Sequence, residues 1–556
     1  MMSKPTLAIY GSKDLDSRTY PVFSHAHNLC LMKDGKILQY LDLERYTRRK
    51  YDNRLDLFKE ELIENKIIDL PNEFDFVLAN DFLSGSFISK NGKIRFESDR
   101  SKVLKPELID GTLTLLEGER SVKKENAFCA PHELAHILST VPFYGEFKEN
   151  SLLISFDGAS SHGNYSAFLY RNGKLFLIEN NWTDLGFASK IFNDNRLSFE
   201  VLNTKSYDHC SVPGKLMGFA SWGKYNRKIE NWLSENDLFN HYGNVTPEKV
   251  LASIKKRFGE VCPAFDTHNK FLQDCAATLQ YIFESAILKK LSDLQEKYHT
   301  DYLYYGGGCA LNIVTNTKIV ESGLFKDVFI APCCNDSGLS VGAATLLEIQ
   351  KGKKIALHSP YLCNAGLSHT NYEVFDSEIE RTAEMIMQQK IIGICNGSGE
   401  IGPRALGNRS LVALANSKEL AKKLSQEVKK REWYRPVAPI MLLENAKLVT
   451  DQNVTTLARF MLQDFIIKEE FHKKMAGVVH ANNTARIQTI ASEEENPFIF
   501  RLLKFLYQKY DVLALINTSF NAAGEPIVHT PQQAMESAKK MNLDGIIING
   551  KLEILK

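Results

Sequence analysis

Two strand patterns, each closed by a hairpin signal, constrain the fold of this chain most strongly. The first surrounds Asp34-Gly35, a dipeptide that two-residue hairpin turns favour, with apolar residues on both sides. The second surrounds Asn172-Gly173 and follows an apolar stretch, residues 152–156, that predicts a buried strand. A strand-and-hairpin unit that occurs twice indicates a duplicated α/β architecture.

The length of the chain predicts more than this duplicated unit. A chain of 556 residues with ordinary globular composition is long enough for about two to four domains. A long helical stretch, residues 269–294, follows the second hairpin, and a stretch with Lys, Pro and Gly at 351–368 predicts a domain boundary. We therefore expect one domain over residues 1–357 and a second α/β domain over residues 358–556.

Composition and charge exclude several classes of protein. The net charge is +1, so nucleic acid is not indicated by charge, although a local basic site is compatible with it. No apolar run reaches the roughly 18 residues that a membrane span requires, and the N-terminus lacks a secretory pattern. The ten cysteines show no CxxC spacing, and we interpret Cys333-Cys334 as two small buried residues. These features predict a cytoplasmic protein without membrane contact.

Two histidines one helical turn apart, His132 and His136, predict a candidate metal site. The pair is weak evidence alone, because a surface or capping pair has the same spacing. Two acidic residues strengthen it. Asp157 ends a predicted strand and Asp336 lies between a strand and a helix, where ligands of α/β sheets normally bind. Nitrogen and oxygen ligands of this kind suit Fe(II), Mn(II) or Zn(II).

A glycine-rich junction between a predicted strand and a helix is a candidate nucleotide contact. It comprises Gly306, Gly307 and Gly308 and leads to Asn312. Free amide groups and a helix N-terminus there favour an anion or a polar ribose. A packing turn explains the glycines equally well, so the residues alone leave both interpretations open.

The second half of the chain carries basic residues in loops rich in Gly and Pro. Arg404 and Arg409 lie in one such loop, and Lys429 and Arg435 lie near a second Pro. Guanidinium groups bind phosphate oxygens in pairs, and converging cations stabilise charge during phosphoryl or nucleotidyl transfer. Solvated surface ion pairs are the alternative. Further candidates for the same site are Arg486, Asn517 and Ser519.

In their order and spacing, these stretches resemble the NodU/CmcH family of O-carbamoyltransferases, which includes nodulation-factor, cephamycin and tobramycin carbamoyltransferases. The resemblance runs from Ser24 to the C-terminus. It is carried by residues 34–35, 43–52, 132–136, 157–158, 213–220, 307–312, 336–338, 402–410, 431–439, 517–521 and 524–526.

The resemblance implies an α/β fold in two parts. The N-terminal domain would be of the actin/sugar-kinase type, similar to the tRNA threonylcarbamoyl transferase subunit, and the C-terminal domain would be YrdC-like. The YrdC-like domain would form carbamoyl adenylate from carbamoyl phosphate and ATP, with Mg²⁺ accompanying the ATP. The N-terminal domain would then transfer the carbamoyl group to a hydroxyl, with an iron-type metal, Fe²⁺, in its site.

The resemblance also assigns roles to individual residues. The implied metal ligands are His132, His136, Asp336 and Asp157. The implied adenylate-binding residues are Gly306, Gly307, Gly308 and Asn312. The implied carbamoyl phosphate and ATP site comprises Arg404, Lys429, Arg435 and Ser519, with Arg409, Arg486 and Asn517 as neighbours.

The N-terminal stretch departs from the family pattern. The family has His-Asp-Ala-Ser ahead of the first hairpin, whereas this chain has His25-Ala26-His27-Asn28. His25 matches the family histidine that we expect to act as general base on the acceptor hydroxyl. Ala26 stands in place of the usual aspartate, which bears on the orientation of His25, and His27 is the alternative base.

Three other functions fit parts of the sequence. An actin-like sugar kinase or ATPase would use Asp157 and the glycine junction but would leave the C-terminal basic set unused. A tRNA threonylcarbamoyl-type modifier is disfavoured by the near-neutral charge, and a nucleotide-sensing module with a decayed site is suggested by Ala26. The sequence does not identify the acceptor, since sugars, natural products and a hydroxymethylated nucleobase all offer a hydroxyl. A homodimer is one of the oligomeric states left open.

Overall fold

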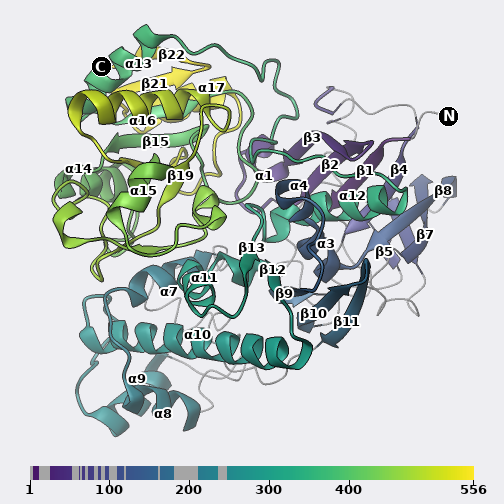
Figure 1. Cartoon of the computed structure of the whole chain (residues 1–556), viewed down its shortest axis with the longest axis horizontal. Helices are drawn as coiled ribbons and strands as arrows, with labels where there is room; N and C mark the ends of the chain where they lie inside the picture. The colour runs from purple at the N-terminus through teal and green to yellow at the C-terminus, as the bar shows by residue number, and fades with distance from the viewer. Residues whose placement is uncertain are drawn as a thin grey trace.

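The structure is a computed structural model. It describes residues 4–11, 26–52, 62, 66–68, 73–79, 86–88, 94–98, 109–117, 120–160, 163–180, 211–235 and 247–556. Within these residues the strands form three large sheets and one two-stranded sheet. Figure 1 shows the first two large sheets side by side and the third in a separate C-terminal unit, coloured green to yellow.

The first sheet has the strand order β3-β2-β1-β4-β8-β7-β6-β5. β2 and β3 form the predicted hairpin, and Asp34 and Gly35 both have positive φ, 50° and 73°, as a two-residue turn of this type requires. β1 runs parallel to β4, and β4 runs parallel to β8. The strands are β1 (Thr6–Tyr10), β2 (Asn28–Lys33), β3 (Lys36–Asp42), β4 (Asp75–Ala79), β5 (Ser86–Ile88), β6 (Ile94–Ser98), β7 (Ile109–Glu117) and β8 (Arg120–Ala130).

The second sheet repeats this arrangement with the order β11-β10-β9-β12-β13. Each sheet thus contains two antiparallel hairpin strands, a central strand and two further strands parallel to it. This repeat confirms the predicted duplication, and the strand order is that of an actin-like core. The strands are β9 (Ser151–Ser160), β10 (Gly163–Arg171), β11 (Lys174–Asn180), β12 (Tyr302–Gly306) and β13 (Asp327–Phe329).

Two helices lie between these sheets. α3 (His132–Leu138) contacts β9 and β12, and α12 (Leu339–Gln350) packs on β1 and β2. The two helices touch closely, because a Cβ on Gly342 would lie 1.8 Å from the carbonyl oxygen of Ala135. α12, which is rich in small residues, therefore needs Gly342 in order to approach α3 this closely.

The second sheet is covered by a long helix, α10 (Lys270–Tyr298), which runs horizontally above α8 and α9 in the lower half of Figure 1. Asn269 caps it by accepting hydrogen bonds from two amides of the first turn, which confirms the predicted helix start. α7 (Val212–Ala220) packs against α10 and extends toward the C-terminal unit. The other helices here are α1 (Leu43–Thr47), α4 (Val141–Tyr144), α8 (Arg227–Glu235), α9 (Pro247–Phe258) and α11 (Ile313–Glu321).

The C-terminal unit is built on a mixed sheet with the order β19-β16-β20-β15-β14-β21-β22. β21 and β22 form an antiparallel pair around the turn at Asn549-Gly550. The strands are β14 (Ile392–Cys395), β15 (Arg409–Leu414), β16 (Ala438–Leu442), β19 (Gln488–Ile490), β20 (Leu515–Ser519), β21 (Gly545–Ile548) and β22 (Lys551–Ile554). The helices are α13 (Asp376–Met387), α14 (Lys418–Lys422), α15 (Leu443–Val449), α16 (Pro497–Tyr510) and α17 (Pro531–Lys540). The small sheet pairs β17 (Phe465–Ile466) with β18 (Thr484–Ala485).

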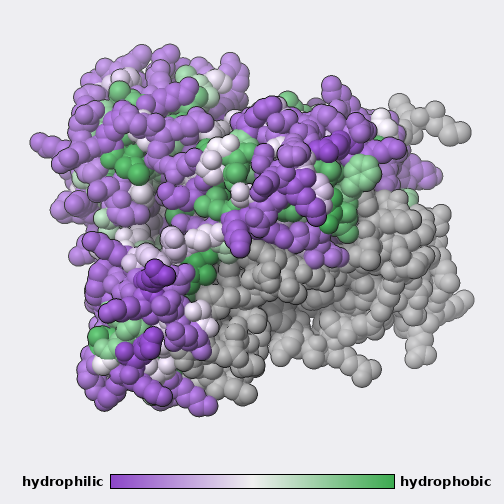
Figure 2. Space-filling view, turned by 60° about the horizontal axis from the view of Figure 1, so that its bottom comes forward, coloured by the Kyte–Doolittle hydropathy of each residue, from purple (hydrophilic) through white to green (hydrophobic). Residues whose placement is uncertain are grey.

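The surface is mostly hydrophilic on the face drawn in Figure 2, where hydrophobic residues form small separate groups. None of the helices in the described part of the chain combines the length and the apolar character that a bilayer crossing needs. The two actin-like sheets and the mixed C-terminal sheet confirm the predicted α/β fold class.

Candidate active site

Four side chains predicted as metal ligands converge in the N-terminal unit. The Nε2 atom of His136 lies 2.9 Å from Nε2 of His132, 2.9 Å from Oδ2 of Asp157 and 3.6 Å from Oδ1 of Asp336. One ligand atom from each of the four residues lies within 4.8 Å of the others. Both histidines and Asp336 are buried, so the cluster is largely shielded from bulk water.

The fold explains why these residues meet. α3 begins directly after β8, and the i,i+4 spacing places His132 and His136 on one face of that helix. Asp157 lies on β9, which pairs in parallel with β12, and Asp336 lies in a 3₁₀ turn that leads into α12. The segments at the carboxyl-terminal sides of β8, β9 and β13 (Asp327–Phe329) therefore meet at one edge of the duplicated core.

Neighbouring groups hold the two carboxylates in place. The hydroxyl of Tyr10 donates a 2.9 Å hydrogen bond to Oδ2 of Asp336, and the amide of Asn28 donates one of 2.9 Å to its main-chain carbonyl. The amide of Gly308 donates a 2.9 Å hydrogen bond to Oδ2 of Asp157. The glycine junction thus fixes a carboxylate of the cluster.

The donor set fits a divalent metal ion. Ligand atoms bound at about 2.0–2.2 Å around one ion lie roughly 3.0–3.5 Å apart. Four of the six pairs among these side chains are 2.9–3.9 Å apart, which brackets that range, and all the ligand atoms lie within 4.8 Å of one another. Two imidazoles and two carboxylates without thiolates also match the preference of Fe(II), Mn(II) or Zn(II). This group of residues could therefore hold such an ion.

The glycine junction is packed more tightly than a nucleotide loop alone would require. Gly307 has a φ of 92°, and a Cβ there would lie 2.1 Å from the carbonyl oxygen of Phe156. A Cβ on Gly306 would lie 2.9 Å from the carbonyl oxygen of His136. Asn312 caps α11 through Thr315 and pairs with Gln280. These contacts show a packing role for the junction, and the adenylate role stays a prediction.

The predicted base cannot be placed, because His25 lies outside the described residues. Ala26 has a positive φ of 55°, which an aspartate tolerates better than alanine does. His27 is buried, and its ring lies 5.7 Å from that of Tyr10, the residue that holds Asp336. His27 is therefore close to the side-chain partners of the cluster.

The C-terminal unit gathers a second cluster, here called the cation cluster: Arg404, Lys429, Arg431, Arg435 and Arg486. Burial, and next the neighbouring Arg435, lower the pKa of Arg431 to about 9. Burial lowers the pKa of Arg404 to about 10, with Arg435 acting in the same direction. Burial and then Arg404 lower the pKa of Arg486 well below its usual range. Positive charges gathered in a partly buried site favour an anion as partner.

Lys429 is the most enclosed member of the cation cluster. Its Nζ donates hydrogen bonds of 2.6 Å to the carbonyl oxygens of Ser519 and Asn521. Burial, and next Arg431, lower its pKa well below the usual range. The hydroxyl of Ser519, the last residue of β20, accepts a 3.4 Å hydrogen bond from Arg431, so Ser519 lies beside the cluster.

Two predicted members occupy different positions. The guanidinium of Arg409 donates to the carbonyl oxygens of Asn396, Gly397, Asn408 and His529, which engages all three of its nitrogens. The structure therefore does not bring Arg409 together with the cation cluster. Asn517 donates to Ala405 and Gln488 beside the Arg404 loop, and its Oδ1 is buried without a partner.

Two residues of this region, Arg431 and His480, lie in the same sequence stretches as predicted site residues but were given no role from the sequence. Arg431 lies two residues after Lys429 in the basic run 429–431. This proximity to a predicted site residue was the available signal. His480 has a buried Nε2 without a partner, and burial followed by Arg486 lowers its pKa to about 4. A histidine in a loop that also carries a predicted arginine, Arg486, was a weaker signal for the same site.

The two clusters share one segment of main chain, residues 331–336. Gly402 approaches it so closely that a Cβ would lie 2.2 Å from the carbonyl oxygen of Pro332. The amide of Gly307 donates a 2.8 Å hydrogen bond to the carbonyl of Cys334. Cys333 and Cys334 are buried free thiols, which confirms their interpretation as packing residues. The loop that carries Arg404 therefore packs directly on the segment that carries Asp336.

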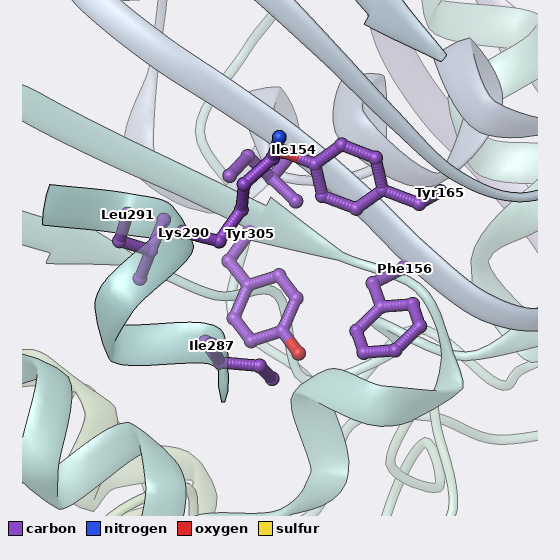
Figure 3. A pocket seen from close by; sticks show the side chains of 7 residues that line it. All are labelled: Ile154, Phe156, Tyr165, Ile287, Lys290, Leu291 and Tyr305. Carbon is purple, nitrogen blue, oxygen red and sulfur yellow. The ribbon is translucent and has the colours of Figure 1, made fainter. Parts of the chain in front are cut away.

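A small cavity lies behind β9 and β12, between the sheet and α10 (Figure 3). Most of its lining is apolar or aromatic, and Figure 3 shows the ring of Tyr305 near Ile287 and Phe156. Lys290 at its edge is paired with Glu179. The remaining lining residues are Ile154, Tyr165 and Leu291. This cavity lies in the core of the second sheet and does not extend the cation cluster.

The fold and the two clusters together define a two-part α/β transferase. Residues 20–345 match the family model of the carbamoyltransferase N-terminus, and residues 383–554 match that of the carbamoyltransferase C-terminus. The chain belongs to the carbamoyltransferase family and is a carbamoyltransferase.

Related proteins align over most of the chain. Uncharacterized protein MJ1058 of Methanocaldococcus jannaschii is 26% identical, with 97% of this chain and 90% of that protein covered. Nodulation protein NolNO of Sinorhizobium fredii is 26% identical over 95% of this chain and 79% of its own length. Nodulation protein U of Azorhizobium caulinodans is 27% identical over 71% and 72%. The predicted resemblance to nodulation carbamoyltransferases is confirmed.

Solved structures show only distant similarity. HypF of T. kodakarensis has 19% identity and a TM-score of 0.22, with 33% of this chain and 24% of that chain covered. A ROK family protein from Streptococcus pneumoniae has 10% identity and a TM-score of 0.28, with 63% and 99% covered. The fold is therefore assigned from the strand orders of this chain.

Proposed function

We propose that this carbamoyltransferase forms carbamoyl adenylate from ATP and carbamoyl phosphate and passes the carbamoyl group to a hydroxyl. The acceptor class is a sugar, a natural product or a hydroxymethylated nucleobase. The observation that carries the proposal is the cation cluster, in which desolvation, together with neighbouring positive charges, lowers the pKa of Arg404, Lys429, Arg431 and Arg486. A polyanionic ligand would offset that repulsion through bidentate hydrogen bonds.

The proposed chemistry balances in three steps. Water displaces phosphate from carbamoyl phosphate and leaves carbamate. An oxygen of the carbamate attacks the α-phosphorus of ATP, and pyrophosphate leaves. The acceptor hydroxyl then attacks the carbonyl carbon of carbamoyl adenylate, AMP leaves, and the hydroxyl proton passes to a base, His25 in our proposal. The cation cluster would offset phosphate charge in the first two steps.

The N-terminal cluster would serve the third step. We propose that His132, His136, Asp157 and Asp336 hold Fe²⁺, which when bound supplies Lewis-acid polarisation of a carbonyl or phosphoryl oxygen. Tyr10 and Gly308 orient the two carboxylates through the hydrogen bonds described above. Burial of the histidines excludes water from the neighbourhood of a hydrolysable intermediate.

The division of labour would follow the predicted domains. Residues 358–556 would form the adenylate with Mg²⁺ and ATP, and residues 1–357 would transfer the carbamoyl group. The close packing of Gly402 against Pro332 supports a short path between the two parts.

Pyrophosphate release tests this proposal. We expect release only when ATP and carbamoyl phosphate are both present, and a carbamoylated product only when a hydroxyl acceptor is added. Arg404→Gln should lower the release rate at least about 100-fold, because an anion contact is lost. Arg381→Gln is the matched control, since Arg381 is exposed and pairs with Glu378 on α13. ATP hydrolysis to ADP without any need for carbamoyl phosphate would instead favour an actin-like kinase or ATPase.

A further inference from the structure

An ion pair joins the N-terminal unit to the loop that carries part of the cation cluster. The Nζ atom of Lys215, on α7, lies 2.8 Å from Oε1 of Glu432. Lys215 is 5% exposed, so its charge is held largely away from solvent. Lysine is seldom buried to this degree without a specific partner, so we interpret the ion pair as a specific structural interaction.

The second carboxylate oxygen of Glu432 reaches the cation cluster. Arg435 donates to Oε2 of Glu432 across 3.2 Å, and the amide of Arg435 donates to the Glu432 carbonyl in the same turn. Burial alone would raise the pKa of Glu432, but Arg435 and Lys215 together lower it. The carboxylate is thus an ionised bridge between one lysine and one arginine.

The position of Arg435 needs such a bridge. Arg404, Arg431 and Arg486 all experience its positive charge, so repulsion favours a conformation in which Arg435 turns away. Glu432 opposes that repulsion from one side. Lys215 in turn neutralises the carboxylate oxygen that Arg435 does not use.

The other contacts of α7 with the loop that carries Glu432 and Arg435 do not depend on the ion pair. The ring of Phe219 packs 5.0 Å from the ring of Tyr434, and Trp222 donates a 3.3 Å hydrogen bond to the carbonyl of Tyr434. A Cβ on Gly218 would make ordinary contact with Pro436 at 3.6 Å. We therefore expect α7 to stay docked on the loop when the charges are changed.

We infer that Lys215 and Glu432 are positioning residues, which hold Arg435 in the cation cluster so that the N-terminal unit sets the geometry of the anion site. The inference rests on the proposed function of that site. It does not make either residue a ligand, because both act through Arg435.

Binding of inorganic pyrophosphate, measured by calorimetry on the full chain at constant pH, tests this inference without requiring catalysis. We expect Lys215→Met to weaken binding about tenfold and Lys215→Arg to restore it to within about twofold of wild type. Glu432→Asp keeps the net charge but is one methylene shorter, so it should also weaken binding several-fold. Glu495→Asp is the matched control, because Glu495 pairs with Arg459 at 2.8 Å outside the cation cluster.

The double variant Lys215→Met/Glu432→Gln separates position from charge. Its net charge equals that of the wild type, so a purely long-range charge effect predicts wild-type affinity. We expect the affinity of the double variant to stay reduced. Wild-type affinity in the double variant or in Lys215→Met would overturn the inference, as would a wild-type chain that binds no pyrophosphate. A chain that binds pyrophosphate but never releases it from ATP would contradict the proposed function alone.

Discussion

The guanidinium of Arg45 donates 2.6 Å hydrogen bonds to the carbonyl oxygens of Glu400 and Gly402. Arg45 is 1% exposed and also lies 3.6 Å from Asp42, so one buried side chain of α1 holds the main chain that leads to Arg404. The carboxylate of Glu400 in turn accepts from the amides of Leu406, Asn408 and Arg409.

Arg45→Met should destabilise the chain. The change leaves the carboxylate of Asp42 and two carbonyls buried without their partner, which lowers the free energy of unfolding by about 3 kcal/mol. Urea unfolding followed by circular dichroism measures the loss. Arg48→Met is the control, since Arg48 contacts Ile527 and Glu525 from a partly exposed position and should cost only about 1 kcal/mol. Equal losses for the two variants would contradict the role given to Arg45.

Tyr10→Phe should weaken metal binding. Removal of the hydroxyl leaves Oδ2 of Asp336 without its 2.9 Å donor, and the loss of such an orienting partner typically lowers metal affinity about 10-fold to 100-fold. Competition with a chelator, read by elemental analysis of the protein, gives the affinity. Asp336→Asn should lose more than Tyr10→Phe, and Tyr302→Phe, at the start of β12, should lose nothing. Unchanged metal content in Tyr10→Phe would argue against an orienting role.

ATP binding should weaken as the pH rises from 8 to 10. The anion prefers the protonated cluster, so binding weakens as the pH rises through the lowered pKa of Arg431, about 9. The charge of the ATP phosphates is constant in this window because their last pKa lies near ~6. The affinity should fall by up to about tenfold per pH unit above that pKa. Fluorescence titration at each pH measures the affinity for ATP. Arg431→Gln should make this affinity depend less on pH. An unchanged pH dependence in that variant would show that another group is responsible.

Gly402→Ala should disrupt the chain far more than Gly524→Ala. Both glycines have positive φ, 90° and 80°, so each substitution strains the backbone by about 1 kcal/mol. The new Cβ at Gly402 would also lie 2.2 Å from the carbonyl oxygen of Pro332, whereas nothing lies within 4 Å at Gly524. Thermal unfolding should show a small loss for Gly524→Ala and a loss several times larger for Gly402→Ala. Similar melting temperatures would mean that the Pro332 loop yields easily.

The sequence predicts most of the framework because its signals are local. A turn dipeptide such as Asn172-Gly173 specifies a hairpin through φ angles that few other residues adopt, and the i,i+4 spacing of His132 and His136 specifies a shared helix face. The outer strands β5, β6 and β7 were not predicted from the sequence. They extend one edge of the first sheet beyond β8, outside the duplicated arrangement that the hairpin signals indicate.

Side-chain roles in the second half depend on partners that are distant in sequence. Arg404 and Arg409 look alike in the chain, in one loop and five residues apart. Only the fold brings the carbonyl of His529 to Arg409, which engages that guanidinium, while the Nε of Arg404 is left buried without a partner. Arg431 was passed over for the same reason, because its neighbours Arg404 and Arg486 come from other loops.

The shared segment at 331–336 limits how such an enzyme can be redesigned. One end of this segment contacts the loop of Arg404, and the other end carries Asp336. A single residue inserted into the segment would therefore displace Asp336 relative to the Arg404 loop. We therefore expect substitutions intended to change the acceptor to be tolerated best in other parts of the N-terminal unit, where they leave the length of this segment unchanged.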